Sequence, residues 1–78
     1  MSTETPLDAR GLKCPLPVLR AGRVLRGMPP GARLRVLADD PVAVIDIPHF
    51  CHEAGHRLLD QREDDGHQIY LIERGPHP

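Results

Sequence analysis

The segment Cys14-Pro15-Leu16-Pro17 constrains the fold more than any other part of this sequence. Two prolines so close together would break a helix interior, but both are tolerated in a first turn, where the N–H that proline lacks has no intrahelical partner. The segment therefore predicts a helix start, with Pro15 and Pro17 as its rigid frame. Because Pro15 disfavours the αR conformation at Cys14, we expect this cysteine at the N-cap or beside it, with its side chain turned toward the helix opening.

This position would give the thiol a chemical use. Unpaired N–H groups and the positive end of the helix dipole favour a thiolate, which is the nucleophile in sulfur chemistry. Arg10 and Lys13 add nearby positive charge. The sequence thus predicts that the pKa of Cys14 lies below the ordinary thiol value of about 8.5, by a small margin because both prolines remove N–H donors. The alternative is a structural cysteine that happens to precede a proline-capped helix.

The helix that begins here has an apolar side and a basic side. Apolar residues recur at three- and four-residue spacing up to Met28, and Pro29-Pro30-Gly31 provides the stop, so the helix should end near Gly27. Three arginines at three-residue spacing form what we call the arginine ridge, made of Arg20, Arg23 and Arg26. The ridge is either a solvated helix face or a docking surface for an acidic partner or a phosphate backbone.

The rest of the chain alternates strand and helix signals. The patterns predict strands over residues 6–9, 32–38, 57–62 and 68–73 and a second helix over residues 42–54. Asp39-Asp40-Pro41 predicts an acidic N-cap for this helix with proline at N1. Pro48 predicts a kink, or two short helices with Asp46 capping the second. Asp64-Asp65-Gly66 suits a type I′ hairpin turn.

These elements predict an α/β (α+β) two-layer sandwich of order βαβαββ, with two helices on one face of a four-stranded mixed sheet. The first two strands should be parallel, joined by a right-handed crossover. Leu34, Val36 and Ala38 alternate onto one face of the sheet. Leu37, Tyr70 and Ile72 are expected toward the other, less covered face, and residues 75–78 are expected to form a frayed tail.

Length and charge limit the classes of function. The 78 residues should form one domain over 1–78, with an ordered core of about residues 6–74. Ten basic against eleven acidic residues argue against stable nucleic-acid binding. No apolar run approaches the length of a membrane span, and the first five residues are too short and polar for a signal peptide, so a cytoplasmic location is expected.

A second group of reactive side chains lies in the second predicted helix, at His49, Cys51, His52 and His56. His52 and His56 have a common metal-ligand spacing, but Cys51 lies at a different angle and Pro48 disturbs the geometry. We therefore expect no metal site. Cys51 as a resolving thiol for Cys14 is a further alternative, although a carrier with a single reactive cysteine does not require one. A reducing compartment would disfavour a disulfide between the two cysteines.

Three motifs together resemble the TusA-like, or SirA-like, small sulfur carrier family. They are LDARGLKCPLPVL over residues 7–19, ADDPVAVIDIPHFC over residues 38–51, and GH at residues 55–56. The resemblance implies a βαβαββ fold and a sulfur carrier, and the thiol chemistry of such a carrier needs no cofactor. It implies that Cys14 accepts sulfane sulfur as a persulfide from a cysteine desulfurase or rhodanese-type donor and relays it to an acceptor protein, for tRNA thiolation, molybdenum cofactor synthesis or sulfur metabolism.

The resemblance also assigns roles to individual residues. Cys14 corresponds to the catalytic cysteine and Pro15 and Pro17 to its structural frame. Arg20, Arg23 and Phe50 are implied as partner contacts. Leu16 stands where the tRNA-thiolating type has glutamate, and Gly22 stands where relatives often have a basic residue on the partner-facing side of the first helix. The alternative function is a non-catalytic interaction or regulatory module of the same fold, which would not need a reactive Cys14.

Overall fold

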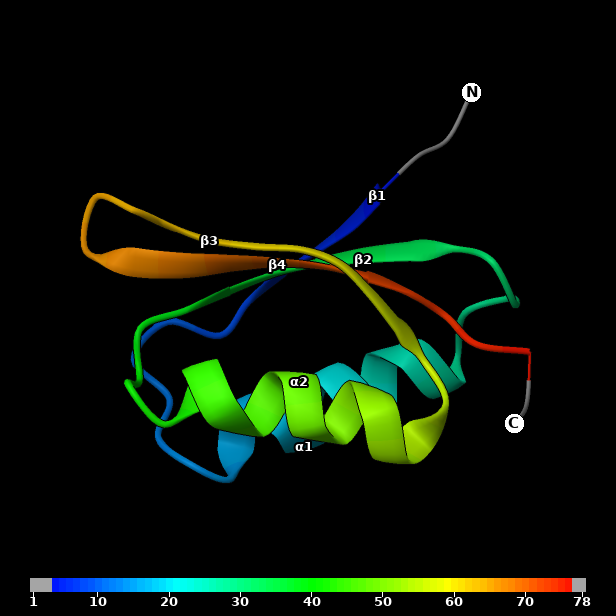
Figure 1. The fold of residues 1–78 in the computed structure, drawn as a ribbon, viewed down its shortest axis with the longest axis horizontal. Coiled ribbons are helices and arrows are strands. Elements are labelled where there is room, and N and C mark those ends of the chain that lie inside the picture. The colour runs from blue at the N-terminus through cyan, green and yellow to red at the C-terminus, as the bar shows by residue number, and fades with distance from the viewer. Residues whose placement is uncertain (1–3, 77–78) are drawn as a thin grey trace.

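The protein folds into two layers, a four-stranded sheet and a pair of helices that covers one of its faces (Figure 1). The computed structural model describes residues 4–76. The elements in chain order are β1 (Glu4–Asp8), α1 (Leu16–Arg26), β2 (Arg33–Ala38), α2 (Ala43–Ala54), β3 (Arg57–Asp64) and β4 (His67–Glu73). The predicted βαβαββ order and the two-layer mixed-sheet architecture are confirmed.

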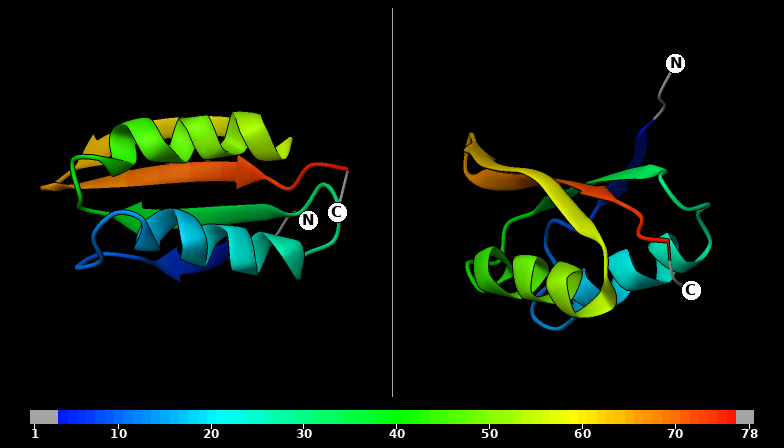
Figure 2. Two further views of the ribbon diagram at one scale, coloured as in Figure 1. Left: turned by 90° about the horizontal axis from the view of Figure 1, so that it is seen from below. Right: turned by 45° about the vertical axis from the view of Figure 1, so that its right-hand side comes forward.

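The sheet has the strand order β1-β2-β4-β3, in which β1 and β2 are parallel and the other neighbours are antiparallel. Helix α1 connects the parallel pair, and both helices begin at the same end of the sheet (Figure 2). The register aligns Glu4 with Arg33 and Arg33 with Glu73. The start of β1 and the end of β4 therefore lie together at the opposite end of the sheet, away from the two helix starts.

The core lies between the sheet and the helices. Leu34, Val36 and Ala38 are fully buried, as their alternation predicts. Tyr70 and Ile72 are also fully buried, so their expected position on the uncovered face is wrong. The register explains the difference, because it pairs Tyr70 with Val36 and Ile72 with Leu34, and paired residues share a face. The helices complete this core with Ala21, Leu25, Ala43, Ile47 and Cys51.

Helix α2 is continuous through Pro48, so the alternative of two short helices capped by Asp46 is wrong. Proline at position 48 leaves the carbonyl of Val44 without its intrahelical N–H. The side-chain amide of Gln61 on β3 donates to that carbonyl at 3.3 Å. The helix also begins at Ala43, with Val42 as its N-cap and no side-chain cap hydrogen bond, so the predicted acidic N-cap is wrong and Pro41 lies in the preceding turn rather than at N1.

The last part of the described chain contains the predicted hairpin and an unexpected contact between Gly75 and His56. Asp65 and Gly66 have φ angles of 51° and 85°, as the central residues of a type I′ turn require. The expected frayed tail is wrong at Gly75, which is buried and donates its N–H to Nδ1 of His56 at 2.9 Å. Pro76 is exposed, and residues 77–78 of the predicted tail lie outside the described residues.

Candidate functional site

Cys14 lies at the end of the sheet where both helices begin. It is exposed and lies in the loop between β1 and α1, one residue before Pro15, which is the N-cap of α1. The expectation that Cys14 would be the N-cap or its neighbour is therefore confirmed. The Cys14–Pro15 peptide bond is cis. Pro15 is exposed while Pro17 is buried, so the second proline packs the first turn of α1 onto the rest of the protein.

Two consecutive aspartates hold the loop that carries the thiol. The carboxylate of Asp40 accepts the backbone N–H of Cys14 at 2.7 Å and that of Val42 at 3.2 Å. Asp39 accepts the N–H of Gly11 at 3.0 Å. The sequence assigned these aspartates only to the start of α2. The adjacent acidic pair just after a strand that is parallel to β1 is the signal that could have identified them, because parallel strands end at the same edge.

A buried chain of hydrogen bonds connects Asp40 to the core. The backbone carbonyl of Asp40 accepts the side-chain amide of Gln68 at 3.2 Å. The side-chain oxygen Oε1 of Gln68 accepts a hydrogen bond from the hydroxyl of Tyr70 at 2.8 Å. Burial raises the pKa of Tyr70 to about 12, so this hydroxyl remains a donor throughout the physiological range. The loop beside Cys14 is thus fixed to the middle of the sheet.

Acid should release this loop. The N–H groups of Cys14 and Val42 lower the pKa of the Asp40 carboxyl, an effect that the charge of Lys13 reinforces and desolvation opposes. Since the folded-state pKa is below the unfolded one, the stabilisation is complete above the unfolded value and is lost as the pH falls through the folded value. In an acid titration by NMR, the amide resonances of Cys14 and Val42 should move together with a midpoint below about 3.9, the ordinary aspartate value.

The Asp40→Asn variant provides the control for this titration. It should lose the common acid transition of the two amides, because asparagine has no proton to gain in this range. A common midpoint at or above the ordinary aspartate pKa in the wild-type protein would contradict the role that we give to Asp40.

The electrostatic environment of the thiol differs from the predicted one. Sγ of Cys14 donates to Oδ2 of Asp46 on α2 at 2.9 Å. This hydrogen bond raises the pKa of Cys14 above its ordinary value, and desolvation and the charges of Asp46 and Asp40 act in the same direction. The predicted lowering is therefore wrong. The guanidinium of Arg10, which was expected to favour the thiolate, binds the carboxylate of Asp8 through two hydrogen bonds of 2.9 Å.

The surface around this end of the protein is more apolar than the arginine ridge suggested. Leu19 in α1 is 58 % exposed and Ile45 in α2 is 72 % exposed, and Leu16 and Val42 are also exposed. All four belong to the first turns of the two helices or to the turn just before α2. A partner that reaches Cys14 would therefore meet apolar side chains as well as charged ones.

The predicted partner contacts lie on both helices. Arg20 and Arg23 are exposed on α1. Phe50 is half-buried and packs toward Gly22, where an added Cβ would lie 3.3 Å from its ring. Gly22 is buried, so it does not occupy the partner-facing position that the resemblance implied. Its lack of a side chain makes room for Phe50 between the helices.

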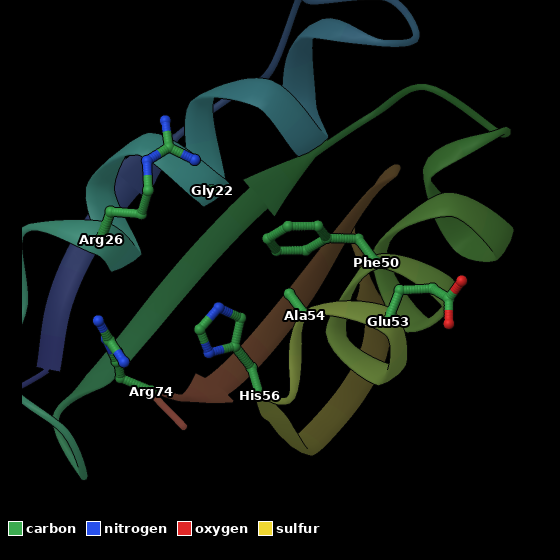
Figure 3. A pocket seen from close by; sticks show the side chains of 7 residues that line it. All are labelled: Gly22, Arg26, Phe50, Glu53, Ala54, His56 and Arg74. Carbon is green, nitrogen blue, oxygen red and sulfur yellow. The ribbon is translucent and has the colours of Figure 1, made fainter. Parts of the chain in front are cut away.

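A cavity of about 320 Å³ lies beside Phe50, over the carboxyl-terminal half of α2 (Figure 3). The side chains of Phe50 and His56 border it on one side and those of Arg26 and Arg74 on the other. The rings of Phe50 and His56 are 5.7 Å apart between centroids. Cys14 is at the opposite end of α1, so this cavity is separate from the thiol.

Cys51 and the neighbouring histidines do not form one cluster. Cys51 is buried in the core, and burial raises its pKa to about 11. His49 and His52 are exposed on α2, while Nδ1 of His56 accepts the N–H of Gly75. Within residues 4–76, no three His, Cys, Asp or Glu side chains come together in an arrangement that could hold a metal ion. The same residues contain no helix long and apolar enough to cross a membrane.

Comparisons with known proteins agree on one relationship. The family model described as "Sulfurtransferase TusA" matches residues 5–74. The sulfur carrier protein TusA of Pseudomonas fluorescens is 43 % identical over 74 residues, which cover 95 % of this chain and 89 % of that protein. The protein of the same name from Pseudomonas putida is 46 % identical over 68 residues, which cover 87 % of this chain and 85 % of that protein.

The fold has a solved counterpart. The crystal structure of a SirA-like protein from Desulfitobacterium hafniense superposes with a TM-score of 0.80 at 25 % identity, and the match covers 94 % of this chain and 99 % of that chain.

Proposed function

The chain belongs to the sulfurtransferase TusA family, and from this membership we propose that it is a sulfur carrier that holds sulfane sulfur as a persulfide on Cys14. The observation that carries the proposal is the contrast between its two thiols. Cys14 is exposed on a loop that Asp39 and Asp40 fix in place, whereas Cys51 is buried in the core. One thiol is therefore accessible to another protein.

The proposed chemistry uses only the sulfur of Cys14. Its thiolate attacks the terminal sulfur of a donor persulfide, a new S–S bond forms, and the donor cysteine leaves as a thiolate. An acceptor thiolate then attacks the terminal sulfur on Cys14, and Cys14 leaves as a thiolate that takes a proton from solvent. No metal or other cofactor is required for either step. Pro15 and Pro17 act in this proposal as the frame that holds the reacting sulfur at the surface.

The family resemblance supplies the partners in this proposal. The donor is a cysteine desulfurase or a rhodanese-type protein, and the acceptor belongs to tRNA thiolation, molybdenum cofactor synthesis or sulfur metabolism. We place the carrier in the cytoplasm as one domain, with no stable binding to nucleic acid, since its formal net charge is −1. In every case the partner must present a cysteine at the helix-start end of the molecule.

Sulfur loading followed by discharge tests the proposal. The protein is incubated with a cysteine desulfurase and cysteine, or with a rhodanese and thiosulfate, and intact-mass spectra are recorded. We expect an adduct of about 32 Da that maps to the peptide containing Cys14 and disappears when an acceptor thiol is added. Absence of the adduct with both donors would favour the alternative, a non-catalytic interaction or regulatory module. The raised pKa of Cys14 is the observation that supports this alternative.

The arginine ridge is our proposed docking surface for the donor, together with Phe50. Reversing two of its charges, Arg20→Glu with Arg23→Glu, should slow sulfur acceptance from a desulfurase by about tenfold or more at low salt, because surface charges act mainly on association rate. Folding should be preserved, since both side chains are exposed. The measurement is the initial rate of persulfide formation as a function of salt concentration.

A matched control is the double variant Arg35→Glu with Arg62→Glu. These arginines line a hollow on the uncovered face of the sheet, so the net charge changes equally but away from the helices. Equal slowing of both double variants would show a general charge effect. An unchanged rate and salt dependence in the helix variant would mean that the ridge is only solvated.

A further inference from the structure

The carboxylate of Asp46 meets the exposed thiol directly, although the two residues are far apart in sequence. Oδ2 of Asp46 lies 2.9 Å from Sγ of Cys14 and accepts its proton in a hydrogen bond. Asp46 is half-buried in the first turn of α2, while Cys14 lies in the loop before α1. The contact therefore links the starts of the two helices through the reactive atom itself.

The other charged groups near the thiol reinforce this arrangement. Asp40, from the loop after β2, adds a second negative charge that acts on Cys14. The charge of Lys13 acts on Asp40, and the guanidinium of Arg10 is held by Asp8. The surroundings thus favour a neutral thiol over a thiolate.

We propose that Asp46 is a positioning residue that holds the unloaded Cys14 side chain as a hydrogen-bonded thiol and gives up this bond once Cys14 carries sulfur. Only the second part of this proposal, the loss of the hydrogen bond on loading, rests on the proposed carrier function. When Sγ forms an S–S bond to the transferred sulfur, Sγ no longer carries a proton to donate. A persulfide is also more acidic than a thiol, so the loaded group presents negative charge that the carboxylate repels. Unloaded and loaded carriers therefore differ in one defined contact.

The arrangement has a chemical use in a carrier that waits for partners. A thiolate is the species that oxidants consume and that attacks stray disulfides, so an exposed thiolate would be lost between encounters. The bond to Asp46 keeps the sulfur protonated while the carrier is free. A docking partner that displaces the Asp46 carboxylate, or brings positive charge beside Sγ, releases the nucleophile where it is needed.

The first test uses reduced protein and needs no sulfur donor. The alkylation rate of Cys14 is followed against pH by peptide mass spectrometry in wild type, Asp46→Asn, Asp46→Glu and Glu53→Gln. We expect the midpoint of the Asp46→Asn profile to move to lower pH, with the rate at neutral pH about threefold higher or more. Glu53→Gln removes the same charge from the far end of α2 and should match wild type. Asp46→Glu, which restores the charge, should return the midpoint toward wild type.

A wild-type midpoint in Asp46→Asn, with circular dichroism unchanged, would overturn the role of Asp46 in the unloaded carrier. The second test follows the side-chain carboxyl ¹³C resonances of wild-type protein before and after loading. The resonance of Asp46 should shift, whereas that of Glu53 should stay. A loaded sample with an unmoved Asp46 resonance would overturn the release step. A failure of loading itself would argue against the carrier function and leave the alkylation result to decide the role of Asp46.

Discussion

The Cys14→Ser variant is expected to form no sulfur adduct with either donor, while the Cys51→Ser variant forms it as the wild-type protein does. Serine lacks the nucleophile and cannot form an S–S bond, so the loss should be complete. Cys51 is buried, so a donor protein cannot reach its sulfur. Its pKa is raised to about 11, so little of it is thiolate at neutral pH. Intact-mass spectra recorded under the same loading conditions measure both outcomes.

A folding control keeps this comparison clear. Cys51→Ser places a hydroxyl in the core, which costs about 1–3 kcal/mol when the group finds no partner. Cys51→Ala avoids that polar group, so both variants should be compared by circular dichroism before loading. An adduct that persists in Cys14→Ser would move the carrier role away from Cys14.

The Gly75→Ala variant is expected to lose much of its stability, although Gly75 follows the last strand. A Cβ at this position would overlap the backbone carbonyl of Gly55, and backbone cannot move aside as a side-chain end can. The same residue donates its N–H to His56, so a shift of the chain would also break that bond. Overpacking of this kind costs about 3 kcal/mol or more. For a domain of this size the melting temperature should fall by about 12 °C or more.

Gly27→Ala is the matched control for the thermal melt. Gly27 has a φ of −89° and a Cβ there would lie 3.6 Å from its nearest neighbour, which is an ordinary contact. This variant should melt within a few degrees of wild type. Similar melting temperatures for Gly75→Ala and wild type would show that the segment after β4 contributes little to the fold.

Local patterns predicted most of the fold. The two prolines of the Cys14 segment indicated the start of α1, and Asp65-Gly66 indicated the hairpin turn. Alternation placed Leu34 and Val36 correctly because their neighbours in β2 are mostly charged. It failed in β4, where residues 69–72 are all apolar, so that only pairing with β2 decides that Tyr70 and Ile72 face the helices.

The candidate site was less predictable because its contacts join distant parts of the chain. The proline spacing and the family resemblance together made Cys14 the candidate. The pairing of its backbone with Asp40 and of its sulfur with Asp46 depends on both helices starting at one end of the sheet. The sequence shows that Arg10 carries a positive charge, but it does not show that the carboxylate of Asp8 binds the guanidinium. For the same reason the effect of Pro48 was overestimated, since Gln61 on another strand supplies the donor that α2 lacks.

Both ends of the described chain lie away from the thiol, because β1 begins and β4 finishes at the end of the sheet opposite the helix starts (Figure 1). A second polypeptide joined before Glu4 or after Pro76 would therefore leave the approach to Cys14 clear. The geometry therefore suits this domain to fusion at either end, since an attached domain would lie away from the end of the molecule that carries Cys14.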